Sequence, residues 1–339
     1  MLDLPSQLAT AIATGADIAI SMSGGKDSTA TYLYLMENGV LDRVERAGGK
    51  VYRVFADTGW ELDETYLYLD RLEQRIGKIH RVALWVPGPN EAEPEGYDLL
   101  VPAGKTERWG DGGVMHAERW VYARLIEARL GRYSPLVRLM CQWRKVPTAV
   151  RRWCTDDTKK RPIVEFLATL ANPINVIGVR AEESADRAKH LVSEWSDDYD
   201  ALVWRPIHHL KKAEVIALHT RHGITPNPLY LQGSGAGRVG CGPCVYSGAA
   251  DIRWLSENHA GRLEILADLE DLLHALNLPR VAKGFEPPRW FMVNRQGKDV
   301  PIPVAEAVRL ASDDLGGDAP LLFAAQRAPG CEQWGLCVW

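Results

Sequence analysis

Short apolar runs alternate with helical segments at the start of the chain, and this alternation constrains the fold more than any other feature. Apolar runs at residues 17–21, 51–56 and 82–86 predict strands, and the segments 29–36 and 61–76 between them predict helices. Strands separated by helices pair in parallel, because each helix returns the chain across one face of the sheet. We therefore expect an α/β fold, a parallel twisted sheet with helices on both faces. In such sheets, ligands bind beyond the carboxyl ends of the strands.

The rest of the chain gives weaker signals. Gly, Pro and charged residues predict a long loop at 87–113, and six glycines with two cysteines mark 232–248 as an irregular, ligand-organised loop. Other expected elements are helices at 117–130, 159–170, 211–221 and 263–276, and a strand at 175–179. Residues 285–339 show no clear period. We expect one domain over residues 1–248 and a helical or irregular C-terminal extension over 249–339.

Composition narrows the class of protein. Of the 339 residues, 46% are hydrophobic and 25% are charged, which is typical of a globular domain. Forty basic and 44 acidic side chains leave a net charge of −4, so no global charge draws the chain to nucleic acid or membrane. No apolar run approaches the ~20 residues of a membrane helix, and residues 1–16 lack a secretory signal pattern. We expect a cytoplasmic protein with no membrane partner, whose six cysteines serve a metal, a cluster or redox chemistry.

The string Ser-Gly-Gly-Lys-Asp-Ser at residues 23–28 follows the first predicted strand and opens a helix. Paired glycines allow a tight turn whose backbone N–H groups face an anion, and a helix N-terminus adds partial positive charge. Lys26 brings a full positive charge, and Ser23, Ser28 and Thr29 bring hydroxyls. The spacing matches neither the Walker A loop nor the dinucleotide-binding glycine pattern. The loop therefore predicts a phosphate site of another kind.

Several segments resemble one known family, and they occur in that family's order. The string at 23–28 resembles the pyrophosphate loop of the adenine nucleotide alpha-hydrolase-like (PP-loop ATP pyrophosphatase) superfamily. Four further segments look like its phosphoadenosine phosphosulfate reductase branch: Phe-Ala-Asp-Thr-Gly-Trp-Glu at 55–61, Gly-Val-Arg-Ala-Glu-Glu-Ser at 178–184, Trp-Arg-Pro-Ile at 204–207 and Asn-Pro-Leu-Tyr at 227–230. The resemblance runs from about Ile18 to Gly248. It implies that residues 1–248 form a PP-loop nucleotide-binding domain that carries the cysteine site.

The resemblance also implies an enzyme that binds ATP or a sulfonucleotide and cleaves it at the α-phosphate. It implies catalytic roles for Lys26, Asp27 and Arg180. The implied nucleotide contacts come from Ser21, Ser23, Gly24, Gly25, Lys26, Asp27, Ser28, Asp57, Thr58, Gly178, Arg180 and Arg187. Guanidinium groups suit phosphate and sulfate oxygens, although Arg187 could instead pair with neighbouring acids on a helix face. Asp57 could contact the ribose or a magnesium ion, or could cap the next helix.

Four cysteines form a candidate metal site. Only Gly-Pro separates Cys241 from Cys244, which places both sulfurs on one side of a turn. Cys154, in a Trp-Cys-Thr string, resembles the motif of cluster-bearing family members such as the sulfur-transfer subunit of DNA phosphorothioation systems. Cys141 lies 13 positions earlier and is the natural fourth ligand, although it could be a small buried hydrophobe. Four thiolates suit a 4Fe–4S cluster or a structural zinc ion, and the resemblance favours the cluster.

The two remaining cysteines, Cys331 and Cys337, lie near the end of the chain. Sulfonucleotide reductases carry a nucleophilic cysteine in a C-terminal Glu-Cys-Gly-Leu/Ile-His motif, which this sequence lacks. Either thiol could attack sulfur if it were mobile and deprotonated, but an ordinary thiol or a tail disulfide is the simpler interpretation. The absent motif argues against a standard reductase.

Eight basic residues and two acidic ones lie between Arg138 and Arg161. This basic stretch predicts a positive field that attracts an anionic substrate and could hold a nucleic-acid backbone, unless part of it is a solvated helix face. Four histidines show no metal-like spacing and are expected at the surface or at helix caps: His208, His209, His219 and His222.

We therefore expect a nucleotide-dependent enzyme of sulfur metabolism or sulfur transfer, in which Mg²⁺ accompanies ATP. A cysteine desulfurase or thioredoxin would donate the sulfur or the electrons. Two alternatives stay open. One is a thiol-dependent phosphoadenosine or adenosine phosphosulfate reductase that uses Cys331 or Cys337 and releases sulfite. The other is a nucleotide-sensing or nucleic-acid-binding subunit without turnover.

Overall fold

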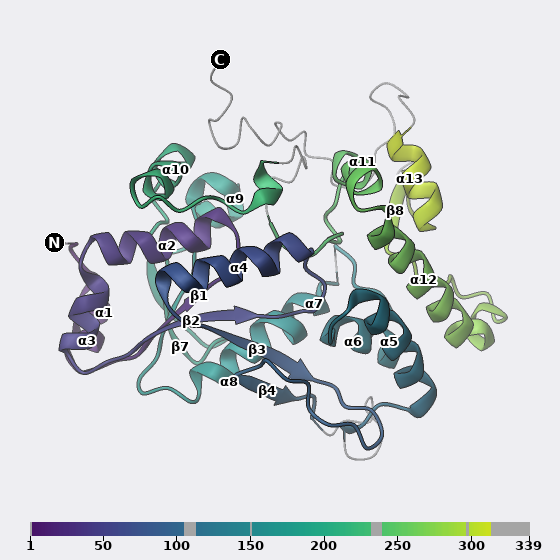
Figure 1. Ribbon diagram of the computed structural model, residues 1–339, viewed down its shortest axis with the longest axis horizontal. Coiled ribbons are helices and arrows are strands. Elements are labelled where there is room, and N and C mark those ends of the chain that lie inside the picture. The colour runs from purple at the N-terminus through teal and green to yellow at the C-terminus, as the bar shows by residue number, and fades with distance from the viewer. Residues whose placement is uncertain (1, 105–112, 150, 232–238, 296–297, 313–339) are drawn as a thin grey trace.

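A seven-stranded sheet forms the centre of the computed structural model, which describes residues 2–104, 113–149, 151–231, 239–295 and 298–312 (Figure 1). The strands lie in the order β4-β3-β2-β1-β5-β7-β6. Their bounds are β1 Ile18–Ser21, β2 Val51–Ala56, β3 Ile79–Trp85, β4 Leu99–Pro102, β5 Ile174–Val176, β6 Ser193–Ser196 and β7 Ala201–Trp204. Neighbouring strands are parallel except β6, which runs antiparallel to β7. The expected α/β fold is confirmed, with one antiparallel strand at its edge.

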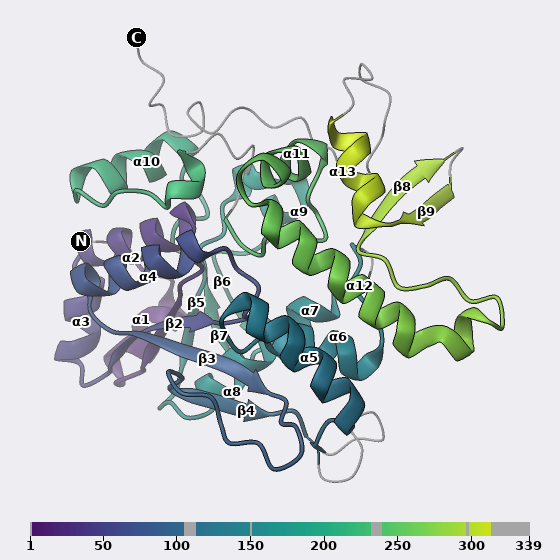
Figure 2. The same cartoon turned by 45° about the vertical axis from the view of Figure 1, so that its right-hand side comes forward.

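Helices cover both faces of this sheet. The α-helices up to residue 221 are α1 Ser6–Ala13, α2 Lys26–Glu37, α3 Val40–Arg46, α4 Asp63–Ile76, α5 Ala117–Leu130, α6 Pro135–Trp143, α7 Trp153–Thr155, α8 Arg161–Leu167, α9 Ala185–Ala188 and α10 Lys212–Arg221. Ile18 and Ile20 of β1 pack in the core shared with α1, α2, α4 and α10, whereas Ala19 and Val54 pack against Phe166 of α8. Figures 1 and 2 accordingly show α2 and α4 on one side of the sheet and α8 on the other. Because successive side chains of a strand point to opposite faces, these strands are apolar at consecutive positions.

The sequence pattern does not predict three strands of the sheet. Strand β4 interrupts the expected loop at 87–113, and β6 and β7 follow the expected strand that the structure forms as β5. Each of the three has four residues, so an alternating pattern has too little length to be recognised. The expected helix at 159–170 also differs, because a π-helical turn at Asp156–Lys160 precedes α8.

The C-terminal residues pack on the side of the molecule that carries α5 and α6 (Figure 2). They form α11 Ala249–Asn258, α12 Ala260–Val281, the hairpin β8 Phe291–Arg295 with β9 Lys298–Ile302, and α13 Val304–Ser312. Leu266 and Leu273 of α12 share a core with Met140 of α6. The buried Glu270 of α12 accepts backbone N–H groups from either side of the hairpin, at Trp290 and Val304. The helix expected at 263–276 lies within α12, and the contacts of Glu270 attach to it the hairpin, which belongs to the part of the sequence without a clear period.

Residues 313–339, which include Cys331 and Cys337, lie outside the described part of the chain. Among the helices that are described, none is both long enough and apolar enough to cross a membrane.

Candidate functional site

The strand order reverses beside β1, and the loops that follow β1 and β5 meet at that point. From β1 the sheet continues through β2, β3 and β4 on one side, and through β5, β7 and β6 on the other. In open parallel sheets, the crevice at such a reversal is where ligands bind. A Cβ atom on Gly178, in the segment after β5, would lie 2.8 Å from the carbonyl oxygen of Asp27. The two loops touch, and the contact requires glycine at position 178.

Hydrogen bonds within residues 23–28 fix the shape of this loop. The Ser28 hydroxyl donates to the Gly25 carbonyl at 2.9 Å and lies 3.2 Å from the Ser23 hydroxyl. The Gly25 N–H donates to Ser23 Oγ at 3.3 Å. Gly24 has a φ of +71°, which favours glycine. The loop ends at the N-terminus of α2, where the helix dipole favours a phosphate.

Two cations flank the loop and share one carboxylate. Lys26 Nζ lies 3.2 Å from Asp27 Oδ2, and Arg180 Nε donates to Asp27 Oδ1 at 2.5 Å. Burial alone would lower the pKa of Arg180, but the carboxylates of Asp27, Glu183 and Glu182 together raise it. The structure thus brings together, beside the loop, the three residues with predicted catalytic roles.

The remaining predicted nucleotide residues lie farther along the same sheet edge. Ser21 is the last residue of β1, and Thr58 follows β2, where its hydroxyl donates to Glu61 at 2.8 Å. Arg187 of α9 pairs with Glu183, four residues earlier in the chain. This is the ion pairing with neighbouring acids that the sequence offers as the alternative, and the predicted contact of Arg187 with a nucleotide stays a prediction.

Two residues beneath the loop are missed by the sequence analysis. His219 is 1% exposed, and its Nε2 donates to the Lys26 carbonyl at 2.8 Å. Tyr230 accepts the Lys26 N–H at 3.2 Å, and its ring centroid lies 5.0 Å from Lys26 Nζ. The expected surface or capping position is wrong for His219, because α10 packs this face against α2 and burial lowers the pKa of the imidazole. His219 lies four residues after the buried Val215 on the same helix, and this spacing could have predicted that its side chain faces the interior.

A buried carboxylate pair lies just after β2. Asp57 Oδ1 accepts the Gly59 N–H at 2.7 Å and lies 2.7 Å from the Tyr66 hydroxyl, which is also 3.1 Å from Glu61 Oε2. Burial, and then the charge of Glu61, raise the pKa of Asp57 to about 6. The suggestion that Asp57 caps the next helix is wrong, since Leu62 is the residue before α4. Asp57 Oδ2 also accepts the Tyr97 hydroxyl at 3.2 Å, so both oxygens of this buried carboxylate are engaged within the protein and its contact with a ribose or a magnesium ion stays a prediction.

Beside this pair, Cys241 and Cys244 line a cavity of about 140 Å³. The Cys241 thiol donates to Glu61 Oε1 at 3.8 Å, and the backbones of the two residues form an antiparallel bridge. A Cβ atom on Gly242 would lie 2.5 Å from Leu62 Cγ, so glycine between the cysteines lets their turn approach the start of α4. The predicted Cys-x-x-Cys pair therefore lies at the same sheet edge as the phosphate loop.

Cys154 lies within the same electrostatic environment. It belongs to α7, directly before the π-helical turn that carries Lys159, whose Nζ lies 3.7 Å from Glu61 Oε1. The pKa of Lys159 is raised, first by the Cys241 thiolate against the effect of burial, and further by Glu61, Cys244 and Cys154. Burial raises the pKa of Cys241 to about 12, and Lys159 opposes this. The ammonium group of Lys159 thus interacts electrostatically with three of the four predicted cysteine ligands.

Cys141 has different surroundings. It is fully buried on α6 inside a large apolar core, whereas Cys154 and Cys241 lie at the edge of that core. Burial raises the pKa of its thiol, and Glu127 and Arg138 are the charged groups that act on it. In the described residues, no three side chains of His, Cys, Asp or Glu are arranged to hold a metal ion as they stand. The predicted site of four cysteines therefore stays a prediction, in which Lys159 acts electrostatically on Cys154, Cys241 and Cys244, and Glu127 and Arg138 act on Cys141.

Much of the basic stretch is engaged within the protein. Arg138 is 1% exposed and donates to Glu127 at 2.7 Å, while Lys160 pairs with an aspartate and Arg161 donates to backbone carbonyls. The exposed basic side chains in this stretch, among the described residues, are Lys145, Arg151 and Arg152. Folding therefore pairs Arg138 inside the core, while the exposed members of the stretch stay available for the predicted positive field.

Comparisons with known proteins show the family of this chain. An uncharacterized 37.8 kDa protein in the gpa 5' region of Escherichia phage 186 is 32% identical over 266 residues, which are 76% of this chain and 75% of that protein. A phosphoadenylyl-sulfate reductase of Candida auris, solved as a phosphate complex, aligns with a TM-score of 0.39 and 14% identity over 70% of this chain and 87% of its own. Residues 17–99 and 136–247, more than half of the chain, match the phosphoadenosine phosphosulfate reductase domain. The chain therefore belongs to the phosphoadenosine phosphosulfate reductase domain family.

Proposed function

We propose that this protein binds ATP or a sulfonucleotide at residues 23–28 and cleaves it at the α-phosphate for sulfur metabolism or sulfur transfer. One observation carries the proposal. The short segment Asn227–Tyr230 contacts the phosphate loop and also lines the cysteine cavity. A nucleotide on the loop would consequently lie beside the thiols, which is the arrangement that sulfur chemistry on a nucleotide requires.

Three contacts define this shared segment. Asn227 Nδ2 donates to the Gly24 carbonyl at 3.2 Å, and Tyr230 accepts the N–H of Lys26 at 3.2 Å. Leu229, between them, lines the cavity that holds Cys241 and Cys244. One 3₁₀ turn therefore contacts the phosphate loop and lines the cysteine cavity.

The residues of the loop supply positive charge where the phosphates would bind. With ATP, an acceptor oxygen forms a bond to the α-phosphorus while the bond from that phosphorus to the pyrophosphate oxygen breaks. The pyrophosphate keeps the electron pair, and Lys26, Arg180 and a nucleotide-bound Mg²⁺ stabilise its charge. Asp27 holds both cations in place before the nucleotide binds.

For the cysteine cavity we propose a 4Fe–4S cluster, with a zinc ion as the alternative. A cluster would supply redox-active iron and sulfide, whereas zinc would hold the turn in place. Lys159 offsets the negative charge of the thiolates, and Leu62 and Trp254 make the cavity wall apolar. A cysteine desulfurase would be the sulfur donor, and thioredoxin the electron donor for a reductive reaction.

The test compares two reactions of the full chain after anaerobic reconstitution. One is pyrophosphate release from ATP with Mg²⁺, alone and with tRNA or DNA; the other is sulfite release from phosphoadenosine phosphosulfate with thioredoxin. Pyrophosphate release supports the proposal. Sulfite release that is lost in a double Cys331→Ser, Cys337→Ser variant identifies the reductase alternative. Tight nucleotide binding without either reaction identifies a sensing or binding subunit and contradicts the proposed catalysis.

Replacing His219 with alanine is expected to weaken nucleotide binding about tenfold, because the Lys26 carbonyl loses its hydrogen bond and the loop loses support. Isothermal titration with ATP on the full chain measures the Kd. The matched control is His222→Ala, at the end of the same helix, where the imidazole contacts Glu37 at 3.3 Å and leaves the loop untouched. Equal Kd changes in the two variants would rule out this supporting role.

A further inference from the structure

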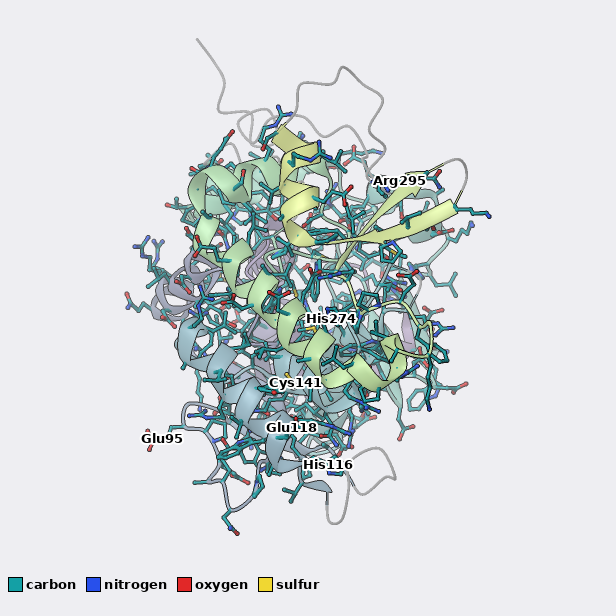
Figure 3. All side chains as sticks on the ribbon, turned by 90° about the vertical axis from the view of Figure 1, so that its right-hand side faces the viewer. Glu95, His116, Glu118, Cys141, His274 and Arg295 are labelled. Atoms are coloured by element: carbon teal, nitrogen blue, oxygen red, sulfur yellow. The ribbon has the colours of Figure 1, made fainter. Side chains whose placement is uncertain are left out.

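A second cavity, of about 210 Å³, lies where helix α12 begins and helix α5 ends. The two helices pack against each other on the side of the molecule that faces the viewer in Figure 3. The cavity is lined by Asp63 from the start of α4, by Arg129 from α5, and by Gly261 and Arg262 from α12. Leu62 lines both this cavity and the cysteine cavity. The proposed nucleotide site uses none of the polar side chains here, so the cavity needs an explanation of its own.

The cavity is lined by a buried cation that lacks a carboxylate partner. Arg262 is 9% exposed, its Nη2 donates to the Glu61 carbonyl, and its Cζ lies 4.9 Å from the centroid of the Trp60 ring. Within the described part of the chain, Nε and Nη1 have no hydrogen-bond partner and no carboxylate pairs with the guanidinium. Burial, and then the charge of Arg132, lower the pKa of Arg262. Because a buried charge is stable only when it is paired, this guanidinium points to a missing anion.

The acids around the cavity do not supply that anion. Three of them pair with cations other than Arg262: Asp63 with Arg132, Glu64 with His259, and Asp268 with Arg129. The side chains of Asp63 and Asp268 are also 74% and 52% exposed, so water screens their charges. Arg132 Nη1 is a further buried donor without a partner in the described residues. The unmet hydrogen-bonding capacity at this point therefore belongs to guanidinium donors.

The first turn of α12 adds partial positive charge to the same cavity. The helix has 22 residues, its first turn holds no acidic residue, and no side chain of the described residues caps it. A Cβ atom on Gly261 would meet nothing within 4 Å, so the space beside this turn is open. Backbone N–H groups at a helix N-terminus bind phosphate and sulfate, and here they lie next to the buried guanidinium of Arg262.

We propose that this cavity is a second anion site, in which the Arg262 guanidinium and the first backbone N–H groups of α12 bind a tetrahedral oxyanion, phosphate or sulfate. Nε and Nη1 of Arg262 are each free to donate to an oxygen of the ion, while Nη2 keeps the Glu61 carbonyl. The site is distinct from the phosphate loop at residues 23–28 and goes beyond the proposed function. The oxyanion is either a free ion or the phosphate group of a larger molecule, because both present the same oxygens.

The experiment titrates inorganic phosphate into the full chain by calorimetry, with a non-hydrolysable ATP analogue present to fill the phosphate loop. Arg262→Gln is expected to weaken phosphate binding about tenfold or more, and Arg262→Lys, which keeps the charge with fewer directed donors, should lie between it and wild type. The matched control is Arg289→Gln, because the Arg289 guanidinium pairs with Glu270 of the same helix at 3.2 Å. This variant should bind phosphate within about twofold of wild type.

A measurement on unaltered protein guards against variants that fail to fold. In wild-type crystals grown with selenate, the anomalous signal of selenium is expected within hydrogen-bond distance of Arg262. The same titration with AMP identifies the source: tighter binding of AMP than of phosphate supports a site for the phosphate group of a larger molecule, and the reverse supports a site for a free ion. A selenium signal at the phosphate loop alone, or equal phosphate affinities of Arg262→Gln and Arg289→Gln, would overturn the proposal and leave Arg262 as a structural contact between α12 and Glu61.

Discussion

Replacing Lys26 with alanine is expected to lower kcat/KM for pyrophosphate release by about 10²–10³-fold, the usual effect of removing one preorganised charge from a transition state. The Lys26 side chain is 7% exposed and its ammonium lies between Asp27 and the Tyr230 ring, so its position is fixed before a nucleotide binds. Its loss would leave the Asp27 carboxylate facing the phosphates with Arg180 as the cation that neutralises it. Initial rates of pyrophosphate release from ATP measure the effect.

The control is a lysine that is paired away from the loop. Lys160 pairs with Asp198 at 2.7 Å, and Lys160→Ala should leave the rate within about twofold of wild type, the range expected of an exposed ion pair. Lys26→Arg keeps the charge on a planar group and should recover part of the rate. A Lys26→Ala variant as active as Lys160→Ala would exclude Lys26 from catalysis.

Replacing Gly59 with alanine is expected to lower the free energy of unfolding by about 4 kcal/mol or more, a loss at the extreme of single substitutions. Gly59 has a φ of +65°, and a Cβ atom there would lie 2.3 Å from the Tyr133 carbonyl oxygen and 2.4 Å from Ser134 Cα. Both atoms belong to the backbone, which cannot relieve the clash by a change of rotamer. The Ser134 hydroxyl and the Leu136 N–H both bind the Thr58 carbonyl, so α6 would have to move away from β2. Urea unfolding followed by tryptophan fluorescence measures the loss.

A variant at Gly131 is the control that separates the strain of a positive φ from the steric clash of a Cβ atom. Its φ of +68° nearly equals that of Gly59, but a Cβ atom there would meet nothing within 4 Å. Gly131→Ala should therefore cost only about 1 kcal/mol, the strain of a left-handed alanine. If the two variants lose equal stability, the close approach of α6 to the end of β2 is not what requires glycine at position 59.

Local patterns in the sequence predict the part of the site that one stretch of chain builds. The strand at Ile18–Ser21, the glycine turn and the helix from Lys26 are adjacent, so apolar runs and paired glycines are enough to place a phosphate loop there. Arg180 is likewise predictable, because it follows a buried strand whose carboxyl end meets the same edge of the sheet. The short strands β4, β6 and β7 are not predictable, because four residues carry almost no periodicity.

The sequence by itself determined a parallel α/β sheet and an anion-binding loop after its first strand, since both follow from periodicity and glycine placement over a few tens of residues. Only the tertiary structure decided which distant side chains meet that loop. Tyr230 and His219 contact Lys26 across 204 and 193 residues, and Glu61 meets Cys241 across 180. It also placed Cys141 inside the core and Arg138 in a buried ion pair, although both lie in a stretch whose local pattern suggests ligands and surface charge. Burial and partner are properties of packing between elements, and no local pattern encodes them.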